Sequence, residues 1–381
     1  MERYNTSVIY IQKEDEIFMQ WIKKHKILII VLSVILALIL AVLGFLWAKL
    51  DLIQFENEVD YDVYNTTSPS GTSDATEPTE PEAEILTDAD MAGLETVETA
   101  PPIPESQVWG HKDVVNILLL GTDEHSVEFS PYSRSDSMIL VSINKRDKTV
   151  KLVSLQRGMG VPVLEGEYEG QHDWLTHMFR YGGAELVRKT VETCFRVEVD
   201  DYVRVNLHSV SAIVDIVGGV EIDMTPAEVA HYNRFFELSG NPRRFSEGVN
   251  LLEGDMAVAF SRLRSIDSDF YRVVRQRRVI GAIVQKLKNA DLIELNAIAD
   301  QVLPLIQTSM SKLEIAELIL YAPSFLNSEF EQMTLPVANT YGGMTGMGGR
   351  NLYAVDFDAN SKVLMEFLYG EDAPTTEAPQ E

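Results

Sequence analysis

The chain has 381 residues, 45% of them hydrophobic and 24% charged, which is enough for one sizeable domain or two small ones. Its 32 basic and 58 acidic residues give a formal net charge of -26, so repulsion from phosphates excludes general nucleic-acid binding. A single cysteine, Cys194, excludes an intrachain disulfide and a cysteine-rich metal cage. We expect Cys194 to be a packed thiol in the core.

Residues 27–47 form an uncharged apolar run that is long enough to cross a membrane. As a helix, its 21 residues reach about 31 Å, the thickness of a bilayer's hydrocarbon core. Three lysines lie just before the run, and after Lys49 the next basic residue is Lys112. The positive-inside rule therefore predicts a cytoplasmic segment, 1–26, one transmembrane helix, 27–48, and an extracellular remainder. The run is too long for an ordinary signal peptide and no small-residue cleavage site follows it, so we expect an uncleaved signal-anchor.

The next segment, residues 49–108, has the composition of a disordered linker. It is rich in Thr, Ser, Pro and Glu, and fifteen acidic residues but no Lys or Arg lie between Asp51 and Val108. Such a segment buries too little apolar surface to offset its ordering entropy. We expect a spacer between the anchor and a folded domain, and a second, shorter disordered tail at residues 371–381.

Strand and helix patterns alternate along residues 109–370, which we expect to form one extracytoplasmic domain. Strand patterns fall at residues 114–120, 137–143, 149–155, 202–207 and 220–224, and helix patterns at residues 181–195, 210–217, 272–288 and 361–368. Interleaved strands and helices predict an α/β fold in which helices cover both faces of a central mixed β-sheet. The glycine-rich stretch 342–349 lacks the setting of a nucleotide-binding loop, and we expect a flexible connection there.

Arginines concentrate in one stretch of this acidic chain. They are Arg262, Arg264, Arg272, Arg275, Arg277 and Arg278. Helical spacing places Arg272, Arg275 and Gln276 on one face, and a further arginine, Arg157, ends a predicted strand. A solvated helix paired with acids is one interpretation. Planar guanidinium groups suit phosphate oxygens, however, and we favour an anion site.

Two aspartates lie at predicted strand ends. Asp123 follows the strand that ends at Gly121, and Asp136 precedes the next strand. Ligands of α/β folds bind at such edges of the sheet. Two carboxylates together with waters and phosphate oxygens are a usual ligand set for Mg²⁺. Carboxylates and arginines together therefore indicate a Mg²⁺-assisted reaction at a phosphate or diphosphate.

Seven segments, spread over residues 114–288, resemble motifs of the LytR-CpsA-Psr family in the family's order and spacing. They are NILLLGTD at 116–123, RSDSMILVSIN at 134–144, KLVSLQR at 151–157, LTHMFRYGGAELVRKTVE at 175–192, DYVRVN at 201–206, IVDIVGGVEI at 213–222 and SRLRSIDSDFYRVVRQ at 261–276. The resemblance implies an α/β fold with a hydrophobic cleft for a polyprenyl chain.

The resemblance also implies a phosphotransferase of cell-wall assembly. In that family a glycopolymer phosphate, as in teichoic acid or capsule polysaccharide attachment, moves from a polyprenyl diphosphate carrier to a peptidoglycan hydroxyl, with Mg²⁺. The partners expected for this chain are thus the lipid-linked glycopolymer, peptidoglycan and the membrane, without nucleic acid. The expected location is the outer face of a Gram-positive-type cell membrane, held by the single N-terminal helix.

Carried over residue by residue, the resemblance implies a metal role for Asp123 and Asp136. It implies catalytic roles for Asp136, Arg157, Asp269 and Arg272, and diphosphate binding by Arg157, Arg262, Arg264, Arg272, Arg275 and Gln276. Asp269 either orients an arginine or assists deprotonation of the acceptor hydroxyl.

Three positions depart from the family's pattern. His125 stands where the family usually has Arg, Gly158 replaces an acid beside Arg157, and Trp174 replaces a common phosphate-binding Lys. Arg180 and His177 are candidates to replace the lost cation. The departures leave two alternative functions open. One is a non-catalytic or regulatory protein that binds lipid diphosphates or the cell wall, and the other is a lipid diphosphatase. Because two acids and several arginines persist, we favour a working transferase of altered specificity.

Overall fold

The computed structural model describes residues 44–56, 86–95, 97, 99, 101–325 and 330–373. The chain divides into two compact units, Met1–Leu52 and Ile53–Glu381. In the first unit, residues 44–50 are helical, and the part of the predicted anchor before them lies outside the described residues. In the part of the chain that the structure describes, no helix has the length and apolar character needed to span a membrane.

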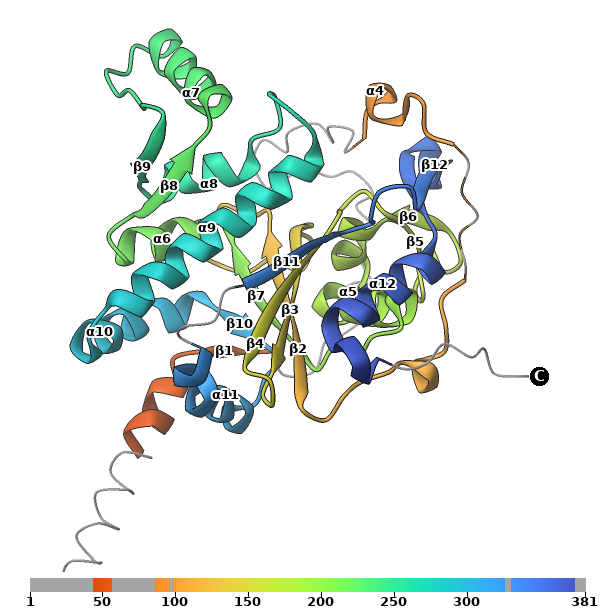
Figure 1. The fold of residues 1–381 in the computed structure, drawn as a ribbon, viewed down its shortest axis with the longest axis horizontal. Helices are drawn as coiled ribbons and strands as arrows, with labels where there is room; N and C mark the ends of the chain where they lie inside the picture. Colours follow the sequence, from red (N-terminus) through yellow and green to blue (C-terminus); the bar gives the residue numbers. More distant parts are fainter. Residues whose placement is uncertain are drawn as a thin grey trace, which may run out of the picture. The chain divides into compact units, whose positions relative to one another are not determined.

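A seven-stranded mixed sheet forms the centre of the second unit (Figure 1), with the order β1-β10-β7-β2-β3-β4-β11. Its strands are β1 (Gln54–Phe55), β10 (Gln307–Thr308), β7 (Asp201–Asn206), β2 (Val114–Thr122), β3 (Ser135–Asn144), β4 (Thr149–Leu155) and β11 (Phe330–Leu335). β2 pairs antiparallel with β3 and parallel with β7, while β4 pairs antiparallel with β3 and parallel with β11. The predicted central mixed sheet is confirmed.

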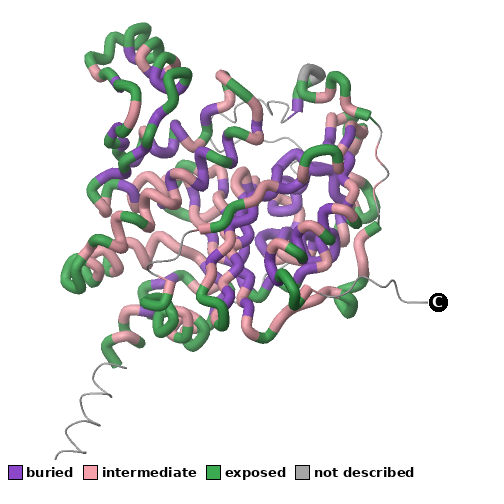
Figure 2. The backbone as a smooth tube through the Cα atoms, in the orientation of Figure 1, coloured by how far each residue is buried: buried purple, intermediate pink, exposed green. Residues whose placement is uncertain are grey.

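Alternating side chains of the central strands fill two separate cores, because successive residues of a strand point to opposite faces. Leu118 and Leu140 belong to the larger core, which helices α5 (Met178–Phe195) and α12 (Phe357–Tyr369) complete. Ile139 and Leu152 face the other way, toward Ile280 of helix α9 (Asp269–Asn289). Helices therefore cover both faces, as predicted, and Figure 2 shows most buried backbone in the strands and in α5. Cys194 is buried in the larger core, as expected of a packed thiol.

Three more helices lie on the α9 side of the sheet. They are α6 (Leu207–Ile216), α8 (Gly254–Arg262) and α10 (Leu292–Val302). α6 begins directly where β7 ends, because the Asn206 side chain accepts a hydrogen bond from the Ser209 N–H and caps the helix. Asp291 and Glu294 form a capping box at the start of α10. These caps fix where the helices start relative to the sheet edge.

A hairpin and a helix extend from this side of the domain, and the sequence patterns located only part of them. β8 (Val220–Met224) pairs with β9 (Gly248–Leu252), and α7 (Pro226–Leu238) joins them. Only β8 was predicted. The remaining elements are α4 (Asp88–Met91), β5 (Gly160–Pro162), β6 (His172–Trp174), α11 (Lys312–Phe325), β12 (Tyr341–Thr345), β13 (Asn351–Val355) and the short 3-10 turns Glu105–Gln107, Leu175–His177, Leu303–Leu305, Met347–Gly349 and Gly370–Asp372.

Two expectations about irregular segments are wrong. The glycine-rich stretch 342–349 is not simply a loop, since β12 forms an antiparallel hairpin with β13. The range 49–108 is not all linker, since β1 adds a strand to the central sheet and Leu86 is buried. Strand β1 is held by backbone hydrogen bonds, which the acidic composition around it does not reveal. Residues 57–85 lie outside the described residues.

Asp201, the first residue of β7, is expected to weaken the fold when it ionises. The carboxylate is 8% exposed and accepts a hydrogen bond from Ser309 Oγ at 2.9 Å, and burial raises its pKa to about 6. A raised folded-state pKa means that the native state binds the proton more tightly, so stability falls as pH rises from about 4 to about 6. Asp201→Asn should therefore raise the free energy of unfolding by roughly 1–3 kcal/mol at pH 7.5.

Denaturant unfolding of the full chain in detergent at several pH values measures this effect. The gain should shrink to nothing below about pH 4, where the wild-type carboxyl is protonated in both states. A variant less stable than the wild type at pH 7.5 would contradict this account of Asp201.

Candidate active site

The central sheet brings a carboxylate and an arginine together at one edge. Asp136 lies at the start of β3 and Arg157 lies just beyond the end of β4, and these ends meet because the two strands are antiparallel. Arg157 Nη1 donates to Asp136 Oδ2 at 3.0 Å. Thr176 Oγ1 donates to the Ser135 carbonyl at 3.0 Å and lies 3.4 Å from Asp136 Oδ1, which anchors the start of the strand.

The first turn of α9 supplies the other half of this cluster. Asp269 accepts two hydrogen bonds from Arg272, from Nε at 2.7 Å and from Nη2 at 3.0 Å. Arg272 Nη1 also donates to the Asp136 carbonyl at 2.7 Å. Arg157 Nη2 lies 3.3 Å from Asp269 Oδ1, and Arg264 Nη1 lies 3.9 Å from the same oxygen. The cluster therefore ties the helix to the sheet edge through Arg157 and Arg272.

Both carboxylates of the cluster are ionised at neutral pH. Burial acts to raise the pKa of Asp136, but the guanidinium groups of Arg157 and Arg272 outweigh it and hold that pKa well below its usual range. The pKa of Asp269 is lowered in the same way, since Arg272 and Arg157 overcome the effect of its burial. Neither carboxylate is a strong base in this environment.

A second aspartate, Asp123, lies near this cluster. Arg134 donates to both oxygens of Asp123, from its backbone N to Oδ1 and from Nε to Oδ2, each at 2.9 Å. These bonds close the connection between β2 and β3 and hold the Asp123 carboxylate beside the sheet edge. Asp123 and Asp136 both line a cavity of about 290 Å³.

That cavity is polar at one end and apolar along the rest. The polar side chains are Thr122, Asp123, Asp136, Ser137, Asn206, Ser261, Arg262, Arg272 and Gln276. The apolar wall comes from the sheet and helices, with Leu119, Val205, Leu207, Val210, Ile213, Val217, Val258, Val279, Ile280, Ile283, Leu287, Ile298, Val302 and Ile306. On α9 the lining runs from Arg272 to Leu287, about 22 Å at the rise of a helix. The site is thus a channel with a charged head and an apolar body.

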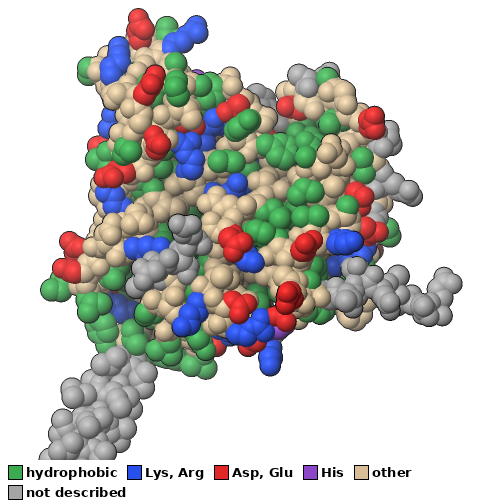
Figure 3. All heavy atoms as spheres, in the orientation of Figure 1, with side chains coloured by type: hydrophobic (Ala, Val, Ile, Leu, Met, Phe, Trp, Pro, Cys, Tyr) green, Lys and Arg blue, Asp and Glu red, His purple; other side chains and the backbone are tan. Residues whose placement is uncertain are grey.

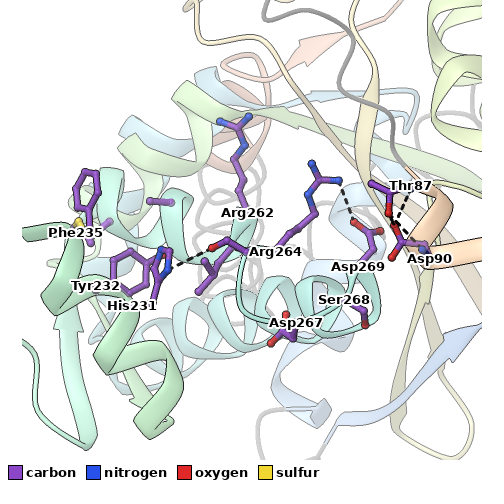
Figure 4. A pocket seen from close by; sticks show the side chains of 14 residues that line it. Thr87, Asp90, His231, Tyr232, Phe235, Arg262, Arg264, Asp267, Ser268 and Asp269 are labelled. Carbon is purple, nitrogen blue, oxygen red and sulfur yellow. Dashed lines mark hydrogen bonds and ion pairs between the residues drawn. The ribbon is translucent and has the colours of Figure 1, made fainter. Parts of the chain in front are cut away.

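Arg262 stands where three cavities meet. It lines the channel, a neighbouring cavity of about 700 Å³ that also holds Arg264 and Asp269, and a third of about 390 Å³ that also holds His125. Figure 4 shows the 700 Å³ cavity, with the Arg262 and Arg264 side chains extended from the end of α8 and the loop after it. Among the described residues, Arg262 has no hydrogen-bond or ion-pair partner, so its guanidinium group is available to a ligand.

Arginines outnumber carboxylates in the network formed by the three aspartates and the arginines around them. These residues are Arg134, Arg157, Arg262, Arg264 and Arg272 against Asp123, Asp136 and Asp269. Five guanidinium groups and three carboxylates leave an excess of two positive charges, in a chain of net charge -26. An anion with about two charges would neutralise this excess.

The structure does not bring Arg275 to this site, although helical spacing had grouped it with Arg272 and Gln276. Arg275 is 3% exposed and bonds Glu228 and Asp267 instead, while Arg272 and Gln276 line the channel. A residue three positions from Arg272 is rotated by about 60° from it on a helix, which turns it toward α7 here. We therefore exclude Arg275 from the diphosphate site. Gln276, by contrast, lines the channel, and its Oε1 accepts a hydrogen bond from Ser137 Oγ at 3.0 Å.

The structure also places Gly158 and Trp174, two of the departures from the family's pattern. Gly158 packs against Leu86, whose side-chain atoms would lie 3.1 Å from a Cβ there, so any larger residue would require Leu86 to shift. Trp174 is buried and donates from Nε1 to the Asn351 carbonyl. His177 does not replace the lost cation, because it is fully buried against Asp173 and burial lowers its pKa.

Several site residues were not singled out from the sequence. Arg134 bonds Asp123, and Thr176 lies beside Asp136. Both residues lie inside the motif segments quoted above, and that position could have identified them as candidate site residues. Ile298, Val302 and Ile306 line the channel from beyond the motif region. Nothing in their local pattern distinguishes a channel wall from an ordinary core.

Fold and site together define an α/β protein with a cradle for an anionic group at the head of an apolar channel. The model of the LytR_cpsA_psr family matches residues 83–364, and the chain belongs to that family. The match begins well before the first recognised motif and ends inside α12, so it covers most of the second unit.

Known relatives agree with this assignment. The chain is 32% identical over 201 residues to a protein of Bacillus mycoides named polyisoprenyl-teichoic acid--peptidoglycan teichoic acid transferase TagU, which covers 52% of this chain and 58% of the relative. An Enterococcus faecalis protein of the same name is 33% identical over 208 residues, 54% of this chain and 64% of the relative. The match thus spans less than two thirds of either relative. The solved structure of TagT bound to LI-WTA has a TM-score of 0.53 at 25% identity and covers 68% of this chain and 91% of its own.

Proposed function

We propose that the chain transfers a glycopolymer phosphate from a polyprenyl diphosphate carrier to a peptidoglycan hydroxyl, at the outer face of the cell membrane, with Mg²⁺. The observation that carries the proposal is the channel, whose lining runs about 22 Å along α9 from a head of arginines and aspartates into an apolar wall. A polyprenyl diphosphate has the same division, with an anionic head on a long apolar chain. The names of the relatives support the same donor and acceptor.

Mg²⁺ fits the carboxylates at the head of the channel. Asp123 and Asp136 line one cavity, and the pKa of Asp136 is held low, so this carboxylate is ionised and able to bind a cation. Among the described residues there is no group of three or more potential ligands. Mg²⁺ commonly takes only one or two carboxylates and completes its shell with waters and substrate phosphates. Bound there, it would act as a Lewis acid on the diphosphate.

The chain's own arginines bind and orient the diphosphate. Arg262 and Arg264 are the accessible donors, and Arg157 and Arg272 fix the sheet edge and the start of α9 around the site. Arg157 Nε is buried without a hydrogen-bond partner among the described residues, so one donor of the cluster stays unused by the protein. These preorganised charges stabilise the negative charge that shifts to the leaving group.

In the transfer step, the acceptor hydroxyl oxygen forms a bond to the phosphorus that carries the glycopolymer. The bond from that phosphorus to the bridging oxygen breaks, and polyprenyl phosphate leaves with this oxygen and its electron pair. The hydroxyl proton passes to solvent or to the leaving phosphate. Phosphoryl transfer depends mainly on positioning and charge stabilisation. Asp269 is a poor base because its pKa is lowered, so we assign it the orientation of Arg272 and Arg157.

A reconstituted transfer assay tests the proposal. The full chain in vesicles is given a radiolabelled polyprenyl-diphosphate-linked glycopolymer and peptidoglycan, and label in the insoluble wall fraction is measured. We expect label to accumulate with Mg²⁺, without any nucleotide, because the carrier already holds the activated bond. Chelation of Mg²⁺ is expected to lower the rate about a hundredfold.

Two other outcomes would decide against the transferase. Release of glycopolymer phosphate into water at the same rate without peptidoglycan would identify a diphosphatase. Donor binding without product in either fraction would identify a binding protein. Restoration of the rate on adding Mg²⁺ back to chelated vesicles is the control for vesicle damage.

A further inference from the structure

We infer that the exposed apolar side chains of α10 and α11 form a docking surface for the outer leaflet of the bilayer, next to the apolar end of the channel. The surface consists of Leu292, Ile293, Leu313 and Leu320, which we call the apolar rim. The inference rests on the proposed lipid-linked donor, whose prenyl chain must pass between the bilayer and the channel.

The rim is apolar and solvent-facing to an unusual degree. The exposed fractions are 84% for Leu292, 81% for Ile293, 70% for Leu313 and 79% for Leu320. Neither α10 nor α11 contains a buried residue, and Figure 3 shows hydrophobic side chains along the edge of the domain where these helices lie. Grouped exposed apolar side chains of this size mark an interaction surface.

The rim is continuous with the wall of the channel. On α10, Leu292 and Ile293 are exposed at the start of the helix, whereas Ile298 and Val302 line the channel about one and a half to three turns later. Ile306 follows the helix and lines the channel as well. A prenyl chain in the channel would therefore contact α10, whose first turn carries Leu292 and Ile293 of the rim.

Connectivity identifies the bilayer as the occupant. Gln54 of β1 donates from its backbone N to the Ile306 carbonyl at 3.1 Å and from Nε2 to the Pro304 carbonyl at 2.8 Å, so β1 lies beside Ile306 of the channel wall. Gln54 follows Trp47, the last residue of the apolar run, by only seven positions. Seven residues span at most about 25 Å. A bilayer that holds the apolar run is thereby kept within about 25 Å of the channel wall beside β1.

Depth measurements on the full chain test the inference. Leu320→Cys and Leu292→Cys are labelled with a nitroxide in vesicles of phosphatidylglycerol and phosphatidylethanolamine, and collision rates with oxygen and with a water-soluble nickel chelate are compared. Burial raises the pKa of the native Cys194 thiol to about 12, so it stays unlabelled. We expect both labels about 5–10 Å below the headgroup surface.

The chain offers a matched control. Leu238 at the end of α7 is also 79% exposed, and Leu238→Cys should report an aqueous label. A label at Leu320 as aqueous as that at Leu238 would overturn the inference. So would spin coupling between labels at Leu320 that disappears on dilution with unlabelled chain, since a second copy would then cover the rim.

Transfer assays separate this inference from the proposed function. Leu313→Ser combined with Leu320→Ser should lower transfer from a bilayer-embedded donor about tenfold and leave transfer from a short-chain, water-soluble donor unchanged. Equal losses with both donors would contradict docking. A chain whose labels lie in the bilayer but which transfers nothing would contradict the proposed function alone.

Discussion

Arg157→Gln is expected to lower glycopolymer transfer about a thousandfold. Among the residues that the structure describes, Arg157 alone has close contacts to both carboxylates of the cluster, Asp136 at 3.0 Å and Asp269 at 3.3 Å. Without it, the buried Asp269 carboxylate and the partly exposed Asp136 carboxylate lose a shared partner, and the diphosphate loses a fixed positive charge. Burial itself lowers the pKa of an arginine, but these two carboxylates outweigh it and keep Arg157 charged.

Arg277→Gln is the matched control for this substitution. Both arginines are 6% exposed, but Arg277 bonds Gln332, Thr334 and the Met333 carbonyl, away from the channel. Each variant should lose stability, so rates are compared at a temperature where circular dichroism shows both folded. Similar losses of transfer in the two variants would mean that general destabilisation explains the effect of Arg157.

Asp269→Asn is expected to lower the free energy of unfolding by about 3 kcal/mol at neutral pH. Asp269 is 7% exposed, and its carboxylate is shared by Arg272, Arg157 and Arg264. Removing its charge leaves three neighbouring guanidinium groups with Asp136 as their remaining carboxylate in the cluster. For a domain of this size, 3 kcal/mol corresponds to a loss of roughly 6–12 °C in Tm.

The pH dependence distinguishes Asp269 from Asp201. The pKa of Asp269 is lowered from its ordinary 3.8, so its stabilisation is present above pH 4 and is lost as pH falls through the folded pKa. Asp201 is as buried, but its pKa is raised, and the same substitution there should stabilise at neutral pH. Equal effects of the two substitutions in denaturant unfolding at pH 7.5 would refute both assignments.

Inorganic diphosphate provides a second measurement on the Asp269→Asn variant. It should raise the Tm of the variant more than that of the wild type, because the anion replaces the missing negative charge among the three arginines. An equal Tm shift in both proteins would show that the arginines are not arranged around a diphosphate.

Local sequence patterns were enough to predict the α/β class, most central strands and most residues of the charged cluster. The strands β2, β3 and β4 are long apolar runs between polar turns, and α9 has a clear helical period, so local patterns specify them. Asp123, Asp136, Arg157 and Asp269 lie at the ends of such elements. Residues at strand and helix ends gather at one edge of an α/β sheet, which made their meeting predictable.

Which arginines line the channel became evident from the packing of the helices. Arg272 and Arg275 lie one turn apart on α9, yet Arg272 lines the channel and Arg275 bonds Glu228 of α7. The choice depends on which neighbour packs on each side of the helix, and helical period does not contain that information. The same holds for β1, whose place in the sheet comes from backbone hydrogen bonds to a strand some 250 residues away in the sequence, at Gln307. Such non-local pairing carries no side-chain signature, because backbone groups are alike at every position.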